Sequence, residues 1–280
     1  MAQNLQQLKK RIKTSDSISQ MAKAMEIVST FKVRRAQNSV KKHSMYAEKI
    51  NSMVRKILST KNFNNGEKEF LKERSKKLIY IISPNKGLCG GLVTGLFKKV
   101  NFYVESCDYV IVVGKKAMDE VAKYGFNVIA SFDTGSNSPK YDDVYPLIDI
   151  AEKYYLSKKV VKISIIYTEF KNILIQKPVI DEIFPMKSND FLKKDGKEYI
   201  FEPNSQQLLK ELLPYYFEVE FYNALINAYA SEQAARMTAM KNARRNANDI
   251  SISLTNIYNR SRQERITNEI LTLANGQQET

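Results

Sequence analysis

Residues 215–275 read YYFEVEFYNALINAYASEQAARMTAMKNARRNANDISISLTNIYNRSRQERITNEILTLAN and contain neither glycine nor proline. Residues 1–65 are equally free of both, whereas all seven prolines and nine of the ten glycines lie between Gly66 and Pro214. Because the two end segments are rich in good helix formers, they are predicted to be long helices. At about 1.5 Å per residue, each would reach on the order of 90 Å, which is too long for a compact domain to cover.

A helix of this length needs a partner for its apolar stripe. Apolar residues recur at intervals of three and four in both segments, with register shifts rather than strict heptads. They include Leu5, Leu8, Ile12, Ile18, Met21, Met25 and Val28 in the first segment, and Phe217, Phe221, Leu225, Ile250, Leu254, Ile257, Ile266, Ile270 and Leu273 in the last. Pairing the two segments as an antiparallel coiled coil would bury both stripes at once. Two separate helices packed on the middle of the chain are the alternative.

The middle of the chain predicts a different architecture. Runs rich in β-formers at 77–83, 109–113, 126–130 and 160–167 alternate with helical stretches at 92–103, 116–124 and 142–156, and extended segments follow at 173–178 and 183–186. This alternation indicates an α/β layer with a mainly parallel sheet. The predicted fold is therefore a long antiparallel coiled coil of the N- and C-terminal helices with an inserted, Rossmann-like α/β domain. The predicted domains are a first helix at 1–65, an α/β domain at 66–214 and a last helix at 215–280.

The positive charge is concentrated in one segment. Of the net charge of +14, residues 1–60 contribute +10, from 13 basic and 3 acidic side chains, whereas residues 215–280 are balanced. Such a segment favours an acidic partner, which could be nucleic acid, anionic lipid or an acidic protein surface; a solvated helix face is the alternative. Two cysteines are too few for a disulfide framework. No apolar run approaches the roughly 18 residues of a membrane helix, and the N-terminus lacks the apolar core of a signal peptide. A soluble, intracellular protein is expected.

Candidate catalytic features are few. The turn Asn85–Gly91 (NKGLCGG) follows a predicted strand and opens a helix, where backbone N–H groups can hold phosphate. Its glycine spacing matches neither nucleotide-binding fingerprint, so a tight structural turn is favoured. His43, the only histidine, has no acidic neighbour to orient it and is predicted to be exposed. Acidic residues show no metal-ligand spacing. The chain is predicted to be non-catalytic, with no cofactor or metal of its own.

Several strings resemble one known family. They are KAMEIV at 23–28, GLCGG at 87–91, SEQAARM at 231–237, AMKNA at 239–243, YNRSRQ at 258–263 and ITNEI at 266–270. In order and spacing they resemble the signature segments of the gamma subunit of F-type ATP synthases. The resemblance covers both ends of the chain and the entry to the α/β domain, and it agrees with the helix–domain–helix plan.

The resemblance implies a rotor. The gamma subunit is the central stalk that turns inside a ring of alpha and beta subunits and couples ATP synthesis or hydrolysis to rotation and proton transport. Its α/β domain lies at the base of the stalk, against the epsilon subunit and the membrane rotor ring. The catalytic sites belong to the ring. A peripheral location at the cytoplasmic face of a bacterial cell membrane follows, with no direct insertion and no nucleic-acid partner.

The resemblance also assigns contacts with the catalytic ring to particular residues. Lys23 and Met25 match positions that face acidic loops of the beta subunits. A polar band of the last helix and a further contact with a beta-subunit loop are matched by Glu232, Gln233 and Arg236, and by Arg262, Gln263 and Thr267.

The chain departs from the family pattern in three places. Residues 17–22 read SISQMA where the family shows a string close to NTQKIT, Asn85 stands where an acidic residue is usual, and Arg244 and Arg245 add charge. A divergent bacterial subunit fits these changes, as does the shaft of an ATP-hydrolysing motor that is not coupled to a proton ring. A basic coiled-coil protein that binds nucleic acid is the other alternative, although no aromatic stacking platform accompanies the charge.

Overall fold

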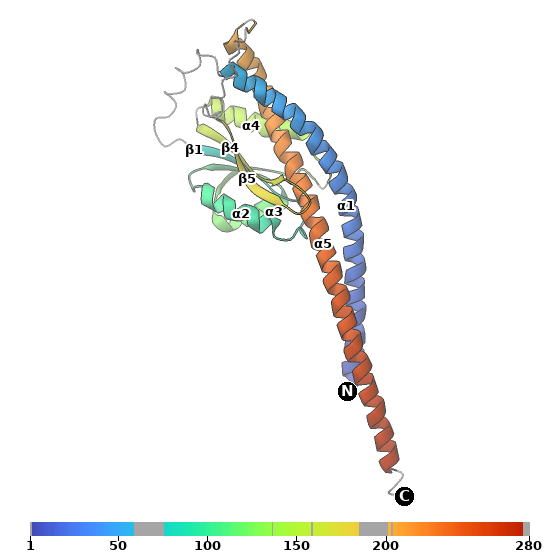
Figure 1. The fold of residues 1–280 in the computed structure, drawn as a ribbon. Coiled ribbons are helices and arrows are strands. Elements are labelled where there is room, and N and C mark those ends of the chain that lie inside the picture. Colours follow the sequence, from blue (N-terminus) through green and yellow to red (C-terminus); the bar gives the residue numbers. More distant parts are fainter. Residues whose placement is uncertain are drawn as a thin grey trace. The chain divides into compact units, whose positions relative to one another are not determined.

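The computed structural model has a long helix at each end of the chain, α1 (Ala2–Leu58) and α5 (Ser205–Gly276) (Figure 1). The structure describes residues 2–58, 76–135, 137–157, 159–184, 201–202 and 204–276, so the predicted boundary at 65/66 lies outside the described residues. By its internal contacts the chain divides into unit 1, which is Met1–Thr30 with Arg236–Thr280, and unit 2, which is Phe31–Ala235. Both long helices contribute to both units.

Helix α5 begins at Ser205, ahead of the predicted start at Tyr215, and it includes Pro214. A proline inside a helix removes one backbone hydrogen bond and costs about 3 kcal/mol. Packing outweighs this local preference. Leu209 and Tyr216, on either side of the proline, pack against a cluster of Ala47, Ile50 and Val54 on α1 with Val219 on α5.

The α/β part of unit 2 is built on one five-stranded sheet with the order β3-β2-β1-β4-β5. Its strands are β1 (Lys76–Ile82), β2 (Tyr109–Val113), β3 (Asn127–Phe132), β4 (Val160–Phe170) and β5 (Gln176–Phe184). All neighbours pair in parallel except β4 and β5, which form an antiparallel hairpin. The mainly parallel sheet is confirmed. The two extended segments predicted at 173–178 and 183–186 contribute to the single strand β5, and residues 185 and 186 lie outside the described residues.

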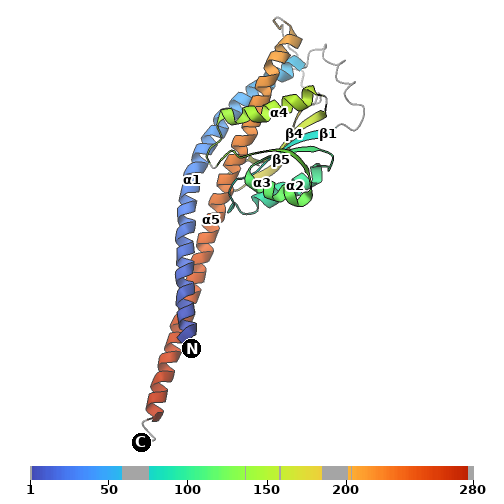
Figure 2. The same ribbon diagram turned by 180° about the vertical axis from the view of Figure 1, so that it is seen from behind.

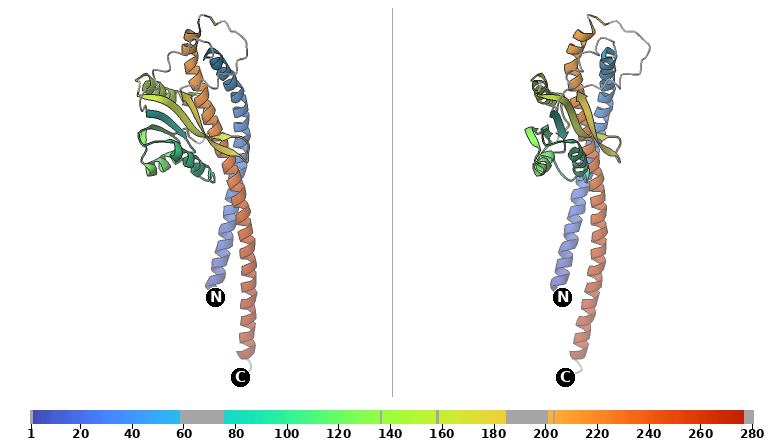
Figure 3. Two further views of the ribbon diagram at one scale, coloured as in Figure 1. Left: turned by 60° about the vertical axis from the view of Figure 1, so that its left-hand side comes forward. Right: turned by 90° about the vertical axis from the view of Figure 1, so that its left-hand side faces the viewer.

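Two cores cover the two faces of this sheet, because alternate side chains of a strand point to opposite faces. Ile79 and Ile81 of β1 pack with α2 (Leu92–Tyr103) and α3 (Lys115–Tyr124). Leu78 and Tyr80 pack with α4 (Tyr145–Leu156), which follows the short 3-10 helix η3 (Tyr141–Val144), and with α5. The views from behind and from the side show these helices on either face (Figures 2 and 3). The sheet is therefore a fixed platform for the part of α5 that lies in unit 2.

Tyr80 connects the sheet to two helices at once. Its hydroxyl donates a 2.8 Å hydrogen bond to the carbonyl of Leu147 on α4, and its ring meets that of Phe221 on α5 edge-on, with 4.7 Å between the centroids. Both aromatic side chains are fully buried. A buried hydroxyl needs such a partner, so this contact lets a tyrosine occupy the core without an unpaired polar atom.

In unit 1, α1 and α5 run antiparallel and side by side (Figure 1). The Ser15 hydroxyl donates to the Ala247 carbonyl over 2.7 Å, and the Ser251 hydroxyl donates to Asp16 over 2.7 Å. The buried positions of α1 here are Leu8, Ser15, Ala22 and Ser29, each seven residues from the next. The half-buried Ile12, Ser19 and Glu26 follow the first three at a distance of four residues. The antiparallel pairing is confirmed, but the predicted register shifts are wrong for this part of α1, which follows a strict heptad.

The predicted apolar stripes are also wrong for much of unit 1. Ile18, Met21, Met25 and Val28 are 45%, 60%, 43% and 54% exposed, and Ile250, Ile257, Ile266 and Ile270 on α5 are exposed as well. The side chain of Leu273 lies outside the described residues. Serine and alanine occupy the seam instead, which lets the helix backbones approach closely. The large apolar side chains consequently lie on the outer surface.

Candidate contact surface on the long helices

Lys23 and Met25 lie on the outer surface of α1 in unit 1, and both are exposed. Met25 belongs to an apolar face with Ile18, Met21, Ile27 and Val28, all of them more than two-fifths exposed. Contiguous exposed apolar residues on a monomer mark a surface that another molecule covers. The structure therefore places both predicted contact residues where a partner can reach them.

Arg262, Gln263 and Thr267 lie on the last turns of α5, which extends beyond the N-terminal end of α1 (Figure 3). Every side chain from Arg262 to Leu271 is exposed. The Thr267 hydroxyl donates to the Gln263 carbonyl over 3.0 Å. Ion pairs at i,i+4, Arg260–Glu264 at 3.1 Å and Arg265–Glu269 at 2.7 Å, support the helix here by a few tenths of a kcal/mol each.

The predicted polar band on α5 is divided. Arg236 belongs to unit 1, whereas Glu232 and Gln233 belong to unit 2. Glu232 is half-buried, and Gln233 is only 2% exposed, with its amide nitrogen 3.4 Å from Glu232 Oε1. Sequence reasoning missed Ser231, whose buried hydroxyl donates to the Thr168 carbonyl of β4 over 2.8 Å. Its only signal was a small residue within an alanine-rich stretch.

His43 is not the exposed residue that the sequence predicts. Its Nε2 lies 3.1 Å from the Val219 carbonyl, and its ring meets that of Tyr222 edge-on, with 4.7 Å between the centroids. Burial lowers the pKa of His43, and the hydrogen bond to Val219 opposes this effect only partly. The lysines beside it in sequence suggested a solvated face, but aromatic residues of α5 cover the ring. His43 thus joins α1 to α5 inside unit 2.

The glycine-rich turn after β1 holds together neighbouring ends of the sheet. Asn85 Oδ1 accepts a 2.9 Å hydrogen bond from the backbone N–H of Lys115, the first residue of α3, and its amide nitrogen donates to the Gly135 carbonyl. Leu88 and Gly90 have φ values of 62° and 60°. Cys89 is buried. These contacts give the turn a structural role.

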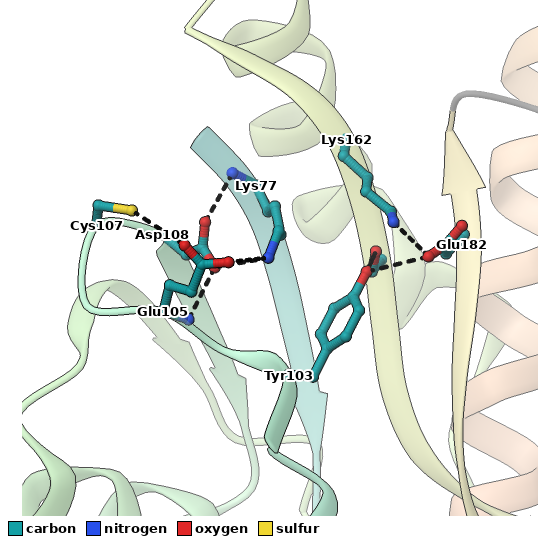
Figure 4. A network of polar contacts seen from close by, with 8 residues as sticks. Lys77, Tyr103, Glu105, Cys107, Asp108, Lys162 and Glu182 are labelled. Atoms are coloured by element: carbon teal, nitrogen blue, oxygen red, sulfur yellow. Dashed lines mark hydrogen bonds and ion pairs between the residues drawn. The ribbon is translucent and has the colours of Figure 1, made fainter. Parts of the chain in front are cut away.

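A polar network joins α2 to the sheet (Figure 4). Lys77 Nζ lies 2.7 Å from Glu105 Oε1 and 3.8 Å from Asp108 Oδ2. Burial disfavours the charge of Lys77, but the Glu105 hydrogen bond and the Asp108 carboxylate together raise the pKa of this lysine. Tyr103 donates to Glu182, which also pairs with Lys162. The arrangement of paired charges is that of a brace. Within the described ranges, no group of three His, Cys, Asp or Glu residues could hold a metal ion.

Comparison with known proteins decides the family. The family model described as ATP synthase matches residues 4–278. The chain is 33% identical to the ATP synthase gamma chain of Dehalococcoides mccartyi (strain BAV1), with 98% of each chain covered. It is 30% identical to the gamma chain of Chloroflexus aurantiacus, with 96% of each covered. The chain belongs to the ATP synthase gamma chain family. As a gamma chain it is the central-stalk subunit of a rotary F-type ATP synthase.

Solved structures share the gamma-chain fold. A chain from the OSCP/F1/c-ring part of the Euglena gracilis mitochondrial ATP synthase aligns with a TM-score of 0.74 at 19% identity, covering 98% of this chain and 93% of that one. A chain from the central stalk/c-ring of the Tetrahymena thermophila enzyme aligns with a TM-score of 0.58 at 23% identity, covering 80% and 99%. The predicted architecture of an α/β domain between two long helices is confirmed. None of the helices in the described part of the chain is both long and apolar enough to span a bilayer.

Proposed function

We propose that this gamma chain is a non-catalytic shaft that turns inside a ring of alpha and beta subunits and couples ATP synthesis or hydrolysis in the ring to proton transport. The observation that carries the proposal is the outer surface of unit 1, where apolar side chains such as Met21 and Met25 are exposed next to cationic ones such as Lys23. An apolar surface can turn against a surrounding ring without holding one angle, whereas charged groups make contacts that depend on angle.

The ring contacts are proposed residue by residue. Lys23 and Met25 meet acidic loops of the beta subunits, and Arg262, Gln263 and Thr267 meet a further beta-subunit loop. Glu232 and Arg236 belong to the polar band. Gln233 is buried, so its contribution to that band is through Glu232, whose carboxylate lies beside its amide.

The proposed division of labour follows the sequence. Residues 1–65 and 215–280 form the shaft, and the α/β domain at 66–214 contacts the epsilon subunit and the membrane rotor ring. The chain then lies at the cytoplasmic face of a bacterial cell membrane as a peripheral part of the complex. It has no nucleic-acid partner, because the basic segment of α1 is matched by acidic loops of the ring.

Purification of the tagged chain from its native cell tests this proposal. The alpha, beta, epsilon and membrane-ring subunits are expected to accompany it, and the isolated chain is expected to show neither ATPase activity nor tight ATP binding. Recovery of alpha and beta subunits without a membrane ring would point to an uncoupled motor. Salt-sensitive affinity for DNA or RNA far above that of other basic proteins would contradict the assignment.

A further inference from the structure

One charged pair lies in the seam between the two helices of unit 1. Glu26 Oε2 on α1 is 3.1 Å from Arg244 Nη1 on α5, and the two side chains are 18% and 36% exposed. Glu26 Oε2 is buried and receives no well-directed hydrogen bond from the described residues. The charge of Arg244 is therefore what compensates this carboxylate.

The rest of the α1 seam in unit 1 offers little to fix the rotation of the helix about its own axis. Its buried members after Leu8 are Ser15, Ala22 and Ser29. Serine and alanine differ little in shape and bury little apolar area, so their packing resists rotation only weakly. The hydrogen bonds of Ser15 to Ala247 and of Ser19 to Asn248 are contacts of neutral groups. A charged contact is stronger, and a partly buried carboxylate without its cation is strongly disfavoured.

Met25 is the neighbour of Glu26 and is 43% exposed. Successive residues of an α-helix are about 100° apart around its axis. When Glu26 points into the seam, Met25 must consequently point outward. If α1 turned by the angle of one residue, Met25 would enter the seam and Glu26 would leave it.

We infer that Glu26 and Arg244 are positioning residues, whose ion pair fixes the rotation of α1 against α5 and thereby aims Met25 at the catalytic ring. The inference rests on the proposed contact of Met25 with the ring. It also gives a role to Arg244, one of the two arginines by which this chain departs from the family pattern. A shift of α1 by one heptad would place Glu26 opposite Met237 or Ser251, neither of which carries a charge.

Two measurements on the same set of variants test the inference. The variants are Glu26→Gln, Arg244→Gln and the exchange Glu26→Arg with Arg244→Glu. Arg245→Gln is the matched control, because it removes the same charge from the exposed neighbouring position. The first measurement is the rate at which a water-soluble thiol reagent labels a cysteine at Met25 in the full chain. Cys107, which is exposed, is replaced by serine in that background. The second is the ATPase turnover of the complex assembled with the native Met25.

Loss of either partner is expected to slow labelling and turnover by roughly threefold to tenfold, within the range of coupling between residues in contact. The two single losses are expected not to add when combined, and the exchanged pair is expected to restore both rates to within about twofold, whereas Arg245→Gln changes neither.

Unchanged labelling in Glu26→Gln and Arg244→Gln would overturn the inference whatever the turnover. A failure of the exchanged pair to restore labelling would overturn it as well, because size and not charge would then set the orientation. Slowed labelling with normal turnover would uphold the orienting role of the pair and would instead contradict the proposed contact of Met25 with the ring.

Discussion

The side-chain amide of Asn51 on α1 donates a 2.7 Å hydrogen bond to Glu220 Oε1 on α5 and so joins the two helices within unit 2. Burial raises the pKa of Glu220, and the negative charge of Asp181 adds to the effect, while the Asn51 hydrogen bond opposes it. The ionised carboxylate is thus held in a place that disfavours its charge. A neutral acceptor of the same shape would suit the site better at neutral pH.

We therefore predict that Glu220→Gln stabilises the chain at pH 7 by about 1 kcal/mol, the scale of one buried polar contact. The folded-state pKa of Glu220 lies above its unfolded value, so the native carboxylate costs stability as pH rises from the unfolded pKa through the folded one. The gain from glutamine should disappear near pH 4, where the glutamate is protonated in both states. Urea unfolding across this range measures it. Glu211→Gln, an exposed change on the same helix, should be neutral, and a loss of stability in Glu220→Gln at every pH would show that the charge is needed.

His43 provides a second prediction about pH. Its folded-state pKa is lowered by burial, so the folded chain binds this proton more weakly than the unfolded chain does. Its contribution to stability is therefore full above the unfolded pKa of about 6.5 and is lost as pH falls through the folded value. Because it is the only histidine, its ring signals in an NMR titration can be assigned directly, and they are expected to move below pH 6.5.

The matched variant for this site is His43→Phe, which keeps the ring packed against Tyr222 but cannot be protonated. Its urea midpoint should fall less than that of the native chain between pH 7 and pH 5.5. Equal falls would mean that another group causes the acid sensitivity.

Gly114 is a position that no other residue can fill without strain. Its φ is +102°, and a Cβ there would lie 2.1 Å from the Ser83 carbonyl oxygen. Gly114→Ala is predicted to destabilise the chain by about 2–4 kcal/mol, because backbone strain and a steric clash add. Gly91→Ala is the control, since nothing lies within 4 Å of its Cβ position and its φ is −83°. Thermal unfolding compares the two, and equal midpoints would mean that the β1 and β2 ends can separate at little cost.

The sequence predicts the elements of this fold well and their packing less well. Helix α2 and strand β2 begin and end where the pattern places them, because glycines or polar turns bound each apolar run. Pro214 misleads, since a local preference of a few kcal/mol is outweighed by the packing of Leu209 and Tyr216 on α1. No local pattern reports such a contact between distant segments.

The candidate site is predictable in its residues and not in its geometry. Periodicity assigns Met21 and Met25 to a buried stripe, because three- and four-residue spacing does not reveal which face of a helix meets its partner. The buried face is the one with Ser15, Ala22 and Ser29, residues that carry little hydrophobic signal. Only the resemblance to known family members marked Met25 as a residue that faces outward to another subunit.

The last prediction concerns transmission of force at Met25. If this exposed side chain faces acidic beta-subunit loops, then Met25→Lys places a cation within reach of carboxylates. A pair of unit charges about 4 Å apart is worth roughly 1–4 kcal/mol between bulk water and a protein surface. The attraction must be broken at each step of rotation, and each 1.4 kcal/mol or so of added barrier slows a step about tenfold. Met25→Lys should therefore assemble but lower turnover or coupling, and neutralising the acidic loop should restore it. Met25→Leu, which keeps the apolar surface, should be nearly silent. Equal turnover and equal transport per ATP in the two assembled variants would show that Met25 faces no acidic loop, and failure of both to assemble would make it a packing residue.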